Sequence, residues 1–188
     1  MMSVQALYTR QTPKCINGEP LSSGPSLIGY DEVLAIIGQV QSKYHVGSTV
    51  LDAQITQNKQ AADSLRQAIT ASLSQQIDSD LAKSLANAAV IEVCESPVCS
   101  RCKGTGQLEK KGEGIVQCTK CHGVGNHIPS QRALHALVMG QLPKDMRMGR
   151  QKFLKDYYDQ YMLVVDRLYR ESSNASSFAK EILSKCYF

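Results

Sequence analysis

The sequence lacks any apolar run that approaches the roughly 18 residues needed to cross a bilayer. Its first residues, MMSVQALYTRQTPK, also lack the basic start and following apolar stretch of a secretory signal peptide. These two absences favour a soluble protein in a reducing, cytoplasmic compartment. In such a compartment the seven cysteines are expected to include metal ligands and not a disulfide framework.

Motifs of catalysis and of nucleotide binding are missing as well. The sequence has no glycine-rich phosphate loop, no H-E-x-x-H pair and no plausible nucleophile elbow. It also lacks the alternation of strands and helices that predicts a nucleotide-binding sheet. We therefore expect that the protein is not an enzyme.

What the sequence does contain is an eight-residue pattern, C-x-x-C-x-G-x-G, which occurs twice as CSRCKGTG and CTKCHGVG. Cys99, Cys102, Cys118 and Cys121 have the spacing C-x2-C-x15-C-x2-C, which is typical of a tetrahedral zinc site. Two residues between paired cysteines let one tight turn aim both thiolates at a single ion. The expected cofactor is one structural Zn²⁺, because four thiolates leave no open position on the metal.

Other uses of these residues are less favoured. C-x-x-C pairs also serve thioredoxin-like redox proteins, but two glycine-matched pairs outside a βαβ pattern favour a metal. His122 follows a ligand directly and could replace one, yet a solvent-facing or backbone-bonded histidine is the preferred interpretation. Cys15, Cys94 and Cys186 have no paired spacing. Cys94 is expected to be buried, and the other two receive no role.

The order of turn formers and apolar residues predicts the organisation of the chain. Residues 1–29 are rich in turn formers and are expected to form a flexible leader. Residues 30–188 are expected to form a helical domain, with the zinc finger inserted at 97–127. The predicted helices span residues 31–44, 58–76, 80–95, 130–140 and 150–171, with a short final helix capped by Asn174, while residues 45–57 could be a short helix or a loop. The expected fold class is mainly α: a helical bundle with a four-cysteine zinc finger inserted between two helices.

Positive charge is concentrated in and after the finger. Residues 1–96 carry 6 basic and 9 acidic side chains, whereas residues 97–170 carry 13 basic and 6 acidic ones. A basic segment around a zinc module is typical of a surface that faces phosphates, although a solvated basic face is the alternative. The candidate phosphate contacts in the finger are Arg101, Lys103, Lys110, Lys111 and Lys120.

The helix after the finger is the best candidate for contacting bases. Its sequence, SQRALHALV, is expected to bury Ala133, Leu134, Leu137 and Val138. The remaining faces near the helix start could then enter a major groove, where arginine and glutamine suit bidentate contacts with bases. The candidate DNA contacts here are Ser130, Gln131, Arg132 and His135. An ordinary solvated helix face is the alternative.

Four tyrosines of the predicted helix 150–171 could stack on bases, but their helical spacing among aliphatic residues favours core packing. They are Tyr157, Tyr158, Tyr161 and Tyr169.

The order of these segments resembles the lambda-type Q antitermination proteins of lambdoid phages. The resemblance covers GYDEVLAIIGQVQS, the helix before the finger, both cysteine repeats with their basic linker, the helix that opens IPSQRALHALV, and YYDQYMLVV. It implies a protein of the bacterial host cytoplasm that binds double-stranded DNA at a phage late promoter. It further implies that the protein engages RNA polymerase holoenzyme, sigma factor included, so that the enzyme transcribes through terminators. In that family the finger is inserted within a helix-turn-helix.

The cysteine repeat also resembles the zinc fingers of DnaJ chaperones, which carry four such repeats for two zinc sites. Here there are two repeats, enough for one site, and the J-domain sequence His-Pro-Asp is absent. The alternative function is therefore a zinc-dependent chaperone or protein-interaction module.

Overall fold

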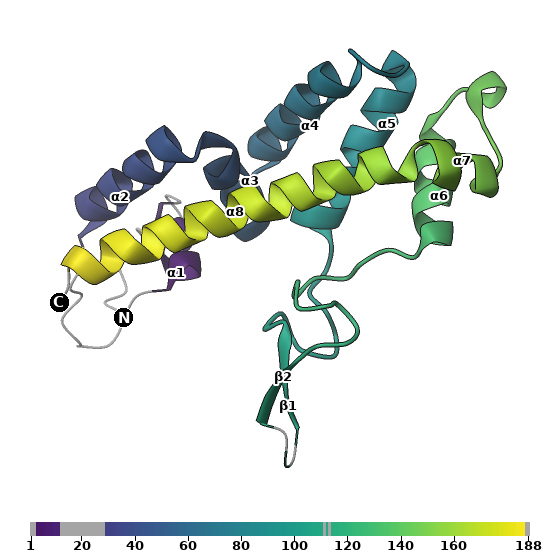
Figure 1. Cartoon of the computed structure of the whole chain (residues 1–188). Coiled ribbons are helices and arrows are strands. Elements are labelled where there is room, and N and C mark those ends of the chain that lie inside the picture. The colour runs from purple at the N-terminus through teal and green to yellow at the C-terminus, as the bar shows by residue number, and fades with distance from the viewer. Residues whose placement is uncertain (1–2, 12–28, 111, 113, 187–188) are drawn as a thin grey trace. The chain divides into compact units, whose positions relative to one another are not determined.

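The computed structural model describes residues 3–11, 29–110, 112 and 114–186. These residues are mainly helical, as predicted, with one short antiparallel pair of strands (Figure 1). The chain divides into two compact units, Met1–Leu65 with Asp166–Phe188, and Arg66–Val165. No helix in the described part of the chain is both long enough and apolar enough to span a membrane.

The first unit is a set of helices around one apolar core. It contains α1 (Val4–Arg10), α2 (Tyr30–Lys43), α3 (His45–Thr56), the first half of α4 (Lys59–Leu73) and the C-terminal part of α8 (Tyr158–Cys186). Its buried core includes Leu7, Tyr8, Val33, Ile37, Val40, Leu51, Ala175, Ala179 and Leu183. Residues 45–56, which the sequence leaves open, are therefore a helix.

Helix α1 contradicts part of the predicted flexible leader. Ser3 caps it by accepting a hydrogen bond from the amide of Ala6, and Leu7 and Tyr8 are fully buried. The hydroxyl of Tyr8 lies 2.7 Å from that of the buried Ser48. Val4, Leu7 and Tyr8 form an apolar pattern only about one and a half helical turns long. This pattern is too short to outweigh the turn-forming residues that follow it in the sequence. Residues 12–28 of the predicted leader lie outside the described residues.

Helix α3 approaches α8 closely at Gly47. A Cβ at this position would lie 2.1 Å from the carbonyl oxygen of Glu171 and 2.8 Å from the Cβ of Ala175. Only a residue without a side chain permits this contact between the two backbones.

The second unit holds the finger between two helices that contact each other. It contains α5 (Ser79–Val90), the π-helix η2 (Ile91–Glu95), β1 (Gln107–Lys110), β2 (Gly114–Gln117), α6 (Gln131–Gln141), the 3₁₀ turn η3 (Lys144–Met146) and α7 (Arg150–Asp156). α5 packs against α6, and α6 packs against α7. The predicted insertion between two helices is confirmed.

Several predicted helix ends are wrong. α5 begins at Ser79, one residue before the predicted helix 80–95, and Asp78 caps it through the amides of Asp80 and Leu81. The predicted helix 150–171 is broken at Tyr157, whose φ of −131° is not helical. Asn174 caps no separate helix, because it is an exposed residue inside α8. Ala175, Ala179 and Leu183 continue the buried face of α8, and this burial outweighs the low helix propensity of the polar residues around Asn174.

We predict opposite effects for alanine at two helical glycines. Gly47→Ala should lower the free energy of unfolding by about 1–3 kcal/mol, because its Cβ clashes with the backbone of Glu171. Gly38→Ala should raise that free energy by about 0.5–1 kcal/mol, because Gly38 is an exposed helical residue and a Cβ there would have no neighbouring atom within 4 Å. Urea denaturation followed by circular dichroism measures both. Equal effects at the two sites would contradict the close approach of α3 and α8.

Candidate metal centre

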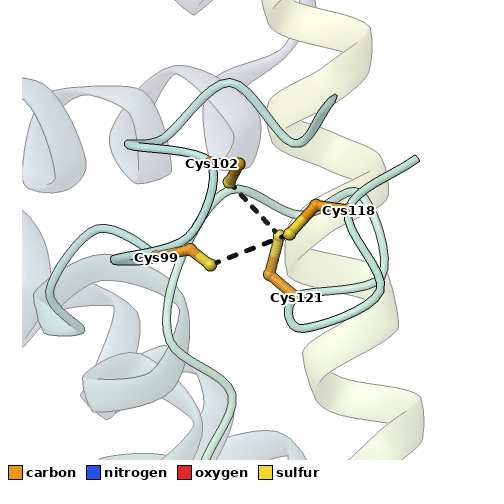
Figure 2. A group of neighbouring side chains, drawn as sticks. All are labelled: Cys99, Cys102, Cys118 and Cys121. Atoms are coloured by element: carbon orange, nitrogen blue, oxygen red, sulfur yellow. Dashed lines mark hydrogen bonds between the residues drawn. The ribbon is translucent and has the colours of Figure 1, made fainter. Parts of the chain in front are cut away.

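The four cysteines of the repeated motif converge on one point (Figure 2). Their sulfur atoms all lie within 4.8 Å of one another, with 4.0 Å between Cys99 and Cys118 and 3.6 Å between Cys102 and Cys121. Each of the four residues is at most 5 % exposed. Sulfurs this close together and this well shielded can hold one metal ion. The structure thus brings together the four residues that the spacing selects.

The two cysteine repeats bind each other in the same way. The amide of Cys99 donates to the carbonyl of Gly125 at 2.7 Å, and the amide of Cys118 donates to the carbonyl of Gly106 at 2.8 Å. The first cysteine of each repeat is therefore fixed by the last glycine of the other. This reciprocal pairing places both pairs of thiols around one centre.

Two of the motif glycines are required by close backbone contacts. A Cβ at Gly106 would lie 2.2 Å from the carbonyl oxygen of Gly123, and one at Gly125 would lie 2.5 Å from that of Gly104. Gly106 and Gly125 also have positive φ angles, of 70° and 88°. A side chain at either position would strain its own backbone and push the repeats apart.

Electrostatics favours a cation among these sulfurs. The backbone amides of Cys102 and Arg101 lower the pKa of the Cys99 thiol to about 6, because N–H groups that face the sulfur stabilise the thiolate. Burial raises the pKa of Cys121 to about 11. Several thiolates in one buried cage repel each other unless a positive ion lies between them.

The finger leaves and rejoins the helical part of its unit at one point. The amide of His127 donates to the carbonyl of Pro97 at 2.9 Å. Val98 and Asn126 form an antiparallel bridge beside it. We call these four residues the stalk. The two ends of the insertion therefore lie side by side.

A chain of polar contacts links the helices next to the finger. Arg66 of α4 forms an ion pair with Glu95, at the end of η2, and its Nε donates to Oδ1 of Asn87 at 2.8 Å. Asn87 of α5 in turn donates to Oε1 of Gln141 in α6 at 2.8 Å. These contacts hold the helix before the finger against the helix after it.

A buried carboxylate lies just before the finger. Glu92 of η2 accepts a 2.6 Å hydrogen bond from the hydroxyl of Tyr161, and the two residues are 4 % and 1 % exposed. Tyr161 is thus a core residue, as its spacing predicts, while Tyr157, Tyr158 and Tyr169 are half-buried. Sequence reasoning missed Glu92. The signal that could have found it was a single charge within the apolar run AAVIEVC, since a buried charge requires a hydrogen-bond partner.

Two of the candidate phosphate contacts reach across the finger. Nη1 of Arg101 donates to the hydroxyl of Thr119 at 2.9 Å, and Nζ of Lys120 donates to the hydroxyl of Ser100 at 2.8 Å. Each cation comes from one repeat and contacts the other, so the two charges lie near each other on an exposed part of the finger. A hydroxyl is uncharged, and neither cation forms an ion pair with any residue that the structure describes.

The other finger cations are placed separately. Lys103 is exposed and has a positive φ of 51°. Lys110, also exposed, ends β1 opposite Gly114. Lys111 lies outside the described residues. The backbone carbonyl of His122 accepts a hydrogen bond from the side chain of Gln117, and the side chain of His122 is exposed.

The first turn of α6 presents polar side chains. Ser130 caps the helix by accepting a hydrogen bond from the amide of Ala133 at 3.2 Å. Gln131 and Arg132 are exposed. Ala133 is exposed too, so its predicted place in the core is wrong, whereas Leu134 and Val138 are buried. The buried stripe of α6 is narrower at its start than the sequence pattern predicts, which enlarges the exposed face.

His135 is the one member of the predicted base-contacting set that lies inward. Its Nε2 is 2.9 Å from the carbonyl oxygen of Met148, and its ring packs edge-on against the buried Phe153, with the ring centres 5.7 Å apart. A carbonyl only accepts hydrogen bonds, so Nε2 carries the proton. His135 therefore ties α6 to the turn before α7.

The chain matches a known protein family along most of its length. Residues 1–98 and 95–187 match the family described as Conserved hypothetical protein CHP02642. The chain belongs to this family. The two matched ranges meet at residues 95–98, directly before Cys99, so the family's sequence pattern extends over the helices and the metal centre alike. A comparison with curated proteins finds no match.

We predict that His135 contributes to the stability of the fold and that Arg132 does not, because His135 makes contacts within its unit and Arg132 is exposed. His135→Ala should lower the free energy of unfolding by about 1–3 kcal/mol, because it leaves the Met148 carbonyl without its partner and removes the contact with Phe153. Arg132→Ala, three residues earlier on the exposed face, should change it by less than about 0.5 kcal/mol. Thermal and urea unfolding measure the difference. If both variants were as stable as the wild type, His135 would not anchor α6.

Proposed function

We propose that the metal held by the four cysteines is a single structural Zn²⁺. Zinc binds thiolates at about 2.3 Å in a tetrahedron, which places the sulfurs about 3.8 Å apart. The separations of 4.0 Å and 3.6 Å between paired sulfurs fit this arrangement. Four protein ligands leave no position for a water nucleophile, so the ion maintains the shape of the finger. The protein in this proposal is not an enzyme.

The finger and α6 together form a surface for double-stranded DNA. The observation that carries this proposal is the exposed first turn of α6, with Gln131 and Arg132, which begins directly after the metal-bound insertion. A helix that presents such residues at its start suits entry into a major groove, where arginine pairs with guanine and glutamine with adenine. The contact between α5 and α6 supports a helix-turn-helix whose turn contains the finger.

Phosphate contacts come from the finger. Arg101 and Lys120 lie near each other and have hydroxyl partners, and Lys103 is exposed two residues after Arg101. Such cations bind the backbone without regard to sequence and fix the position of the protein on the duplex. Ser130 is also exposed and, at the start of α6, is placed to contact a phosphate.

The biological role that we propose is transcription antitermination in a bacterial host infected by a phage. The resemblance of the finger and its flanking helices to the lambda-type Q proteins supports this step. The protein would bind DNA at a late promoter, contact RNA polymerase holoenzyme with its sigma factor, and allow transcription through terminators. Its place of action would be the cytoplasm of the host cell.

One observation favours the second candidate, a polypeptide-binding module of the DnaJ finger type. The finger exposes three large apolar residues, Val98 at 65 %, Ile115 at 74 % and Val124 at 38 %. Exposed apolar side chains on a small zinc module suit contact with an unfolded chain. Binding of an unfolded polypeptide, without salt-dependent affinity for DNA, would favour this candidate over the first.

Antitermination predicts increased readthrough in a purified system. With RNA polymerase holoenzyme and a template that joins the phage late promoter to a terminator, adding the protein should increase the full-length transcript. A Gln131→Ala/Arg132→Ala variant should lose most of the increase, because it removes two exposed side chains from the start of α6 without touching its core. No increase by the wild-type protein would sink the proposal.

Loss of one thiolate should disrupt both metal and DNA binding. Cys118→Ser should reduce bound zinc well below one ion per chain and abolish binding to a DNA site selected by the wild type from a random library, because the metal supplies the folding free energy of the finger. Cys94→Ser is the matched control, since Cys94 lies outside the cluster. Metal analysis and fluorescence anisotropy measure the outcome. Full zinc content and DNA affinity in Cys118→Ser would contradict the assignment.

A further inference from the structure

A second group of cations lies after α6. Residues 144–155, which we call the basic segment, comprise η3, the following turn and most of α7. Their exposed cations are Lys144, Arg147, Arg150, Lys152 and Lys155. The segment contains one acidic residue, Asp145.

The backbone of the basic segment is fixed to α6. Nε of Arg147 donates to the carbonyl of Leu142 at 3.0 Å, and the amide of Met148 lies 3.3 Å from the sulfur of Met139. His135 adds its hydrogen bond to the carbonyl of Met148. Phe153 is fully buried and faces His135. The backbone that carries these cations is thus attached to α6.

Most of these cations have no partner within the described residues. The side chain of Arg147 donates to a backbone carbonyl, but the side chains of Lys144, Arg150, Lys152 and Lys155 make no hydrogen bond or ion pair in that part of the chain. Like charges held close together on a fixed backbone repel each other, and an anionic partner removes this cost. Lys152 and Lys155 are three residues apart in α7, and both are exposed whereas Phe153 between them is buried.

α6 separates the finger from the basic segment, so its length sets the distance between these two groups of cations. Its 11 residues span about 16 Å, with the stalk of the finger before its start and the basic segment after its end. The major groove of B-DNA is about 12 Å wide and is bordered by a phosphate backbone on each side. A helix of this length within the groove places cations at its two ends near both backbones.

We infer that the basic segment is a second phosphate-binding surface, which contacts the DNA backbone on the side of the groove away from the finger. The inference rests on the proposed function. It assigns the DNA backbone as the partner of the basic segment, which the proposed function does not use. His135 is then a positioning residue that couples the contacts of the segment to the face of α6. Since phosphate contacts carry no sequence information, the segment adds affinity and leaves the choice of bases to α6.

The test compares two charge-matched variants of the full-length, zinc-loaded protein. Lys152→Gln/Lys155→Gln removes two cations from the basic segment, and Lys59→Gln/Lys180→Gln removes two exposed lysines from the first unit. Affinity for a fluorescein-labelled duplex of random sequence is measured by anisotropy from about 50 to 200 mM salt. A third variant, Lys152→Arg/Lys155→Arg, keeps the charge. Circular dichroism verifies that all three variants are folded.

We expect the slope of log affinity against log salt to become shallower by about 1.8 for Lys152→Gln/Lys155→Gln, since each lost phosphate contact accounts for about 0.9. The slope should be unchanged in the other two variants. An unchanged slope in Lys152→Gln/Lys155→Gln, while the wild type binds, would overturn the inference and leave the proposed function intact. If that variant instead lost only terminator readthrough, the segment would contact polymerase, which also overturns the inference. Absence of salt-dependent binding by the wild type would overturn both.

Discussion

The finger depends on four buried sulfurs that lie close enough together to hold one metal ion. The finger has two strands of four residues each, and Leu108 is the partly buried apolar residue that packs on its cysteine cluster. So little apolar burial does not stabilise a fold of this size. In our proposal the metal takes the place of a hydrophobic core, and the reciprocal glycine contacts set how closely the two repeats surround it.

Features that depend on local sequence were predictable. The cysteine spacing identified the four residues whose sulfurs cluster, and apolar periodicity identified α2, α4 and α6. The wrong predictions concern segments whose structure depends on burial in the tertiary fold. α1 forms because Leu7 and Tyr8 enter a core built from residues far along the chain, and α8 continues through Asn174 because its buried face continues.

The same distinction applies to the candidate DNA contacts. Helical periodicity correctly places Arg132 on an exposed face, because exposure at the start of α6 depends only on the direction of its apolar stripe. It does not reveal that the turn before α7 folds back onto His135 and covers it. The charge of the basic segment is visible in the sequence, but its attachment to α6 is not, since that attachment uses backbone carbonyls and a methionine sulfur.

The stalk has a consequence for how this family can diversify. A hydrogen bond between His127 and Pro97 closes the insertion at its base, and the entropic cost of closing this loop rises by only about 0.6 kcal/mol for each doubling of its length. Residues can be added to or removed from the β1–β2 turn without altering the packing of the helices at the base. Selection can therefore lengthen, shorten or recharge the finger as an independent module while the helical scaffold stays constant.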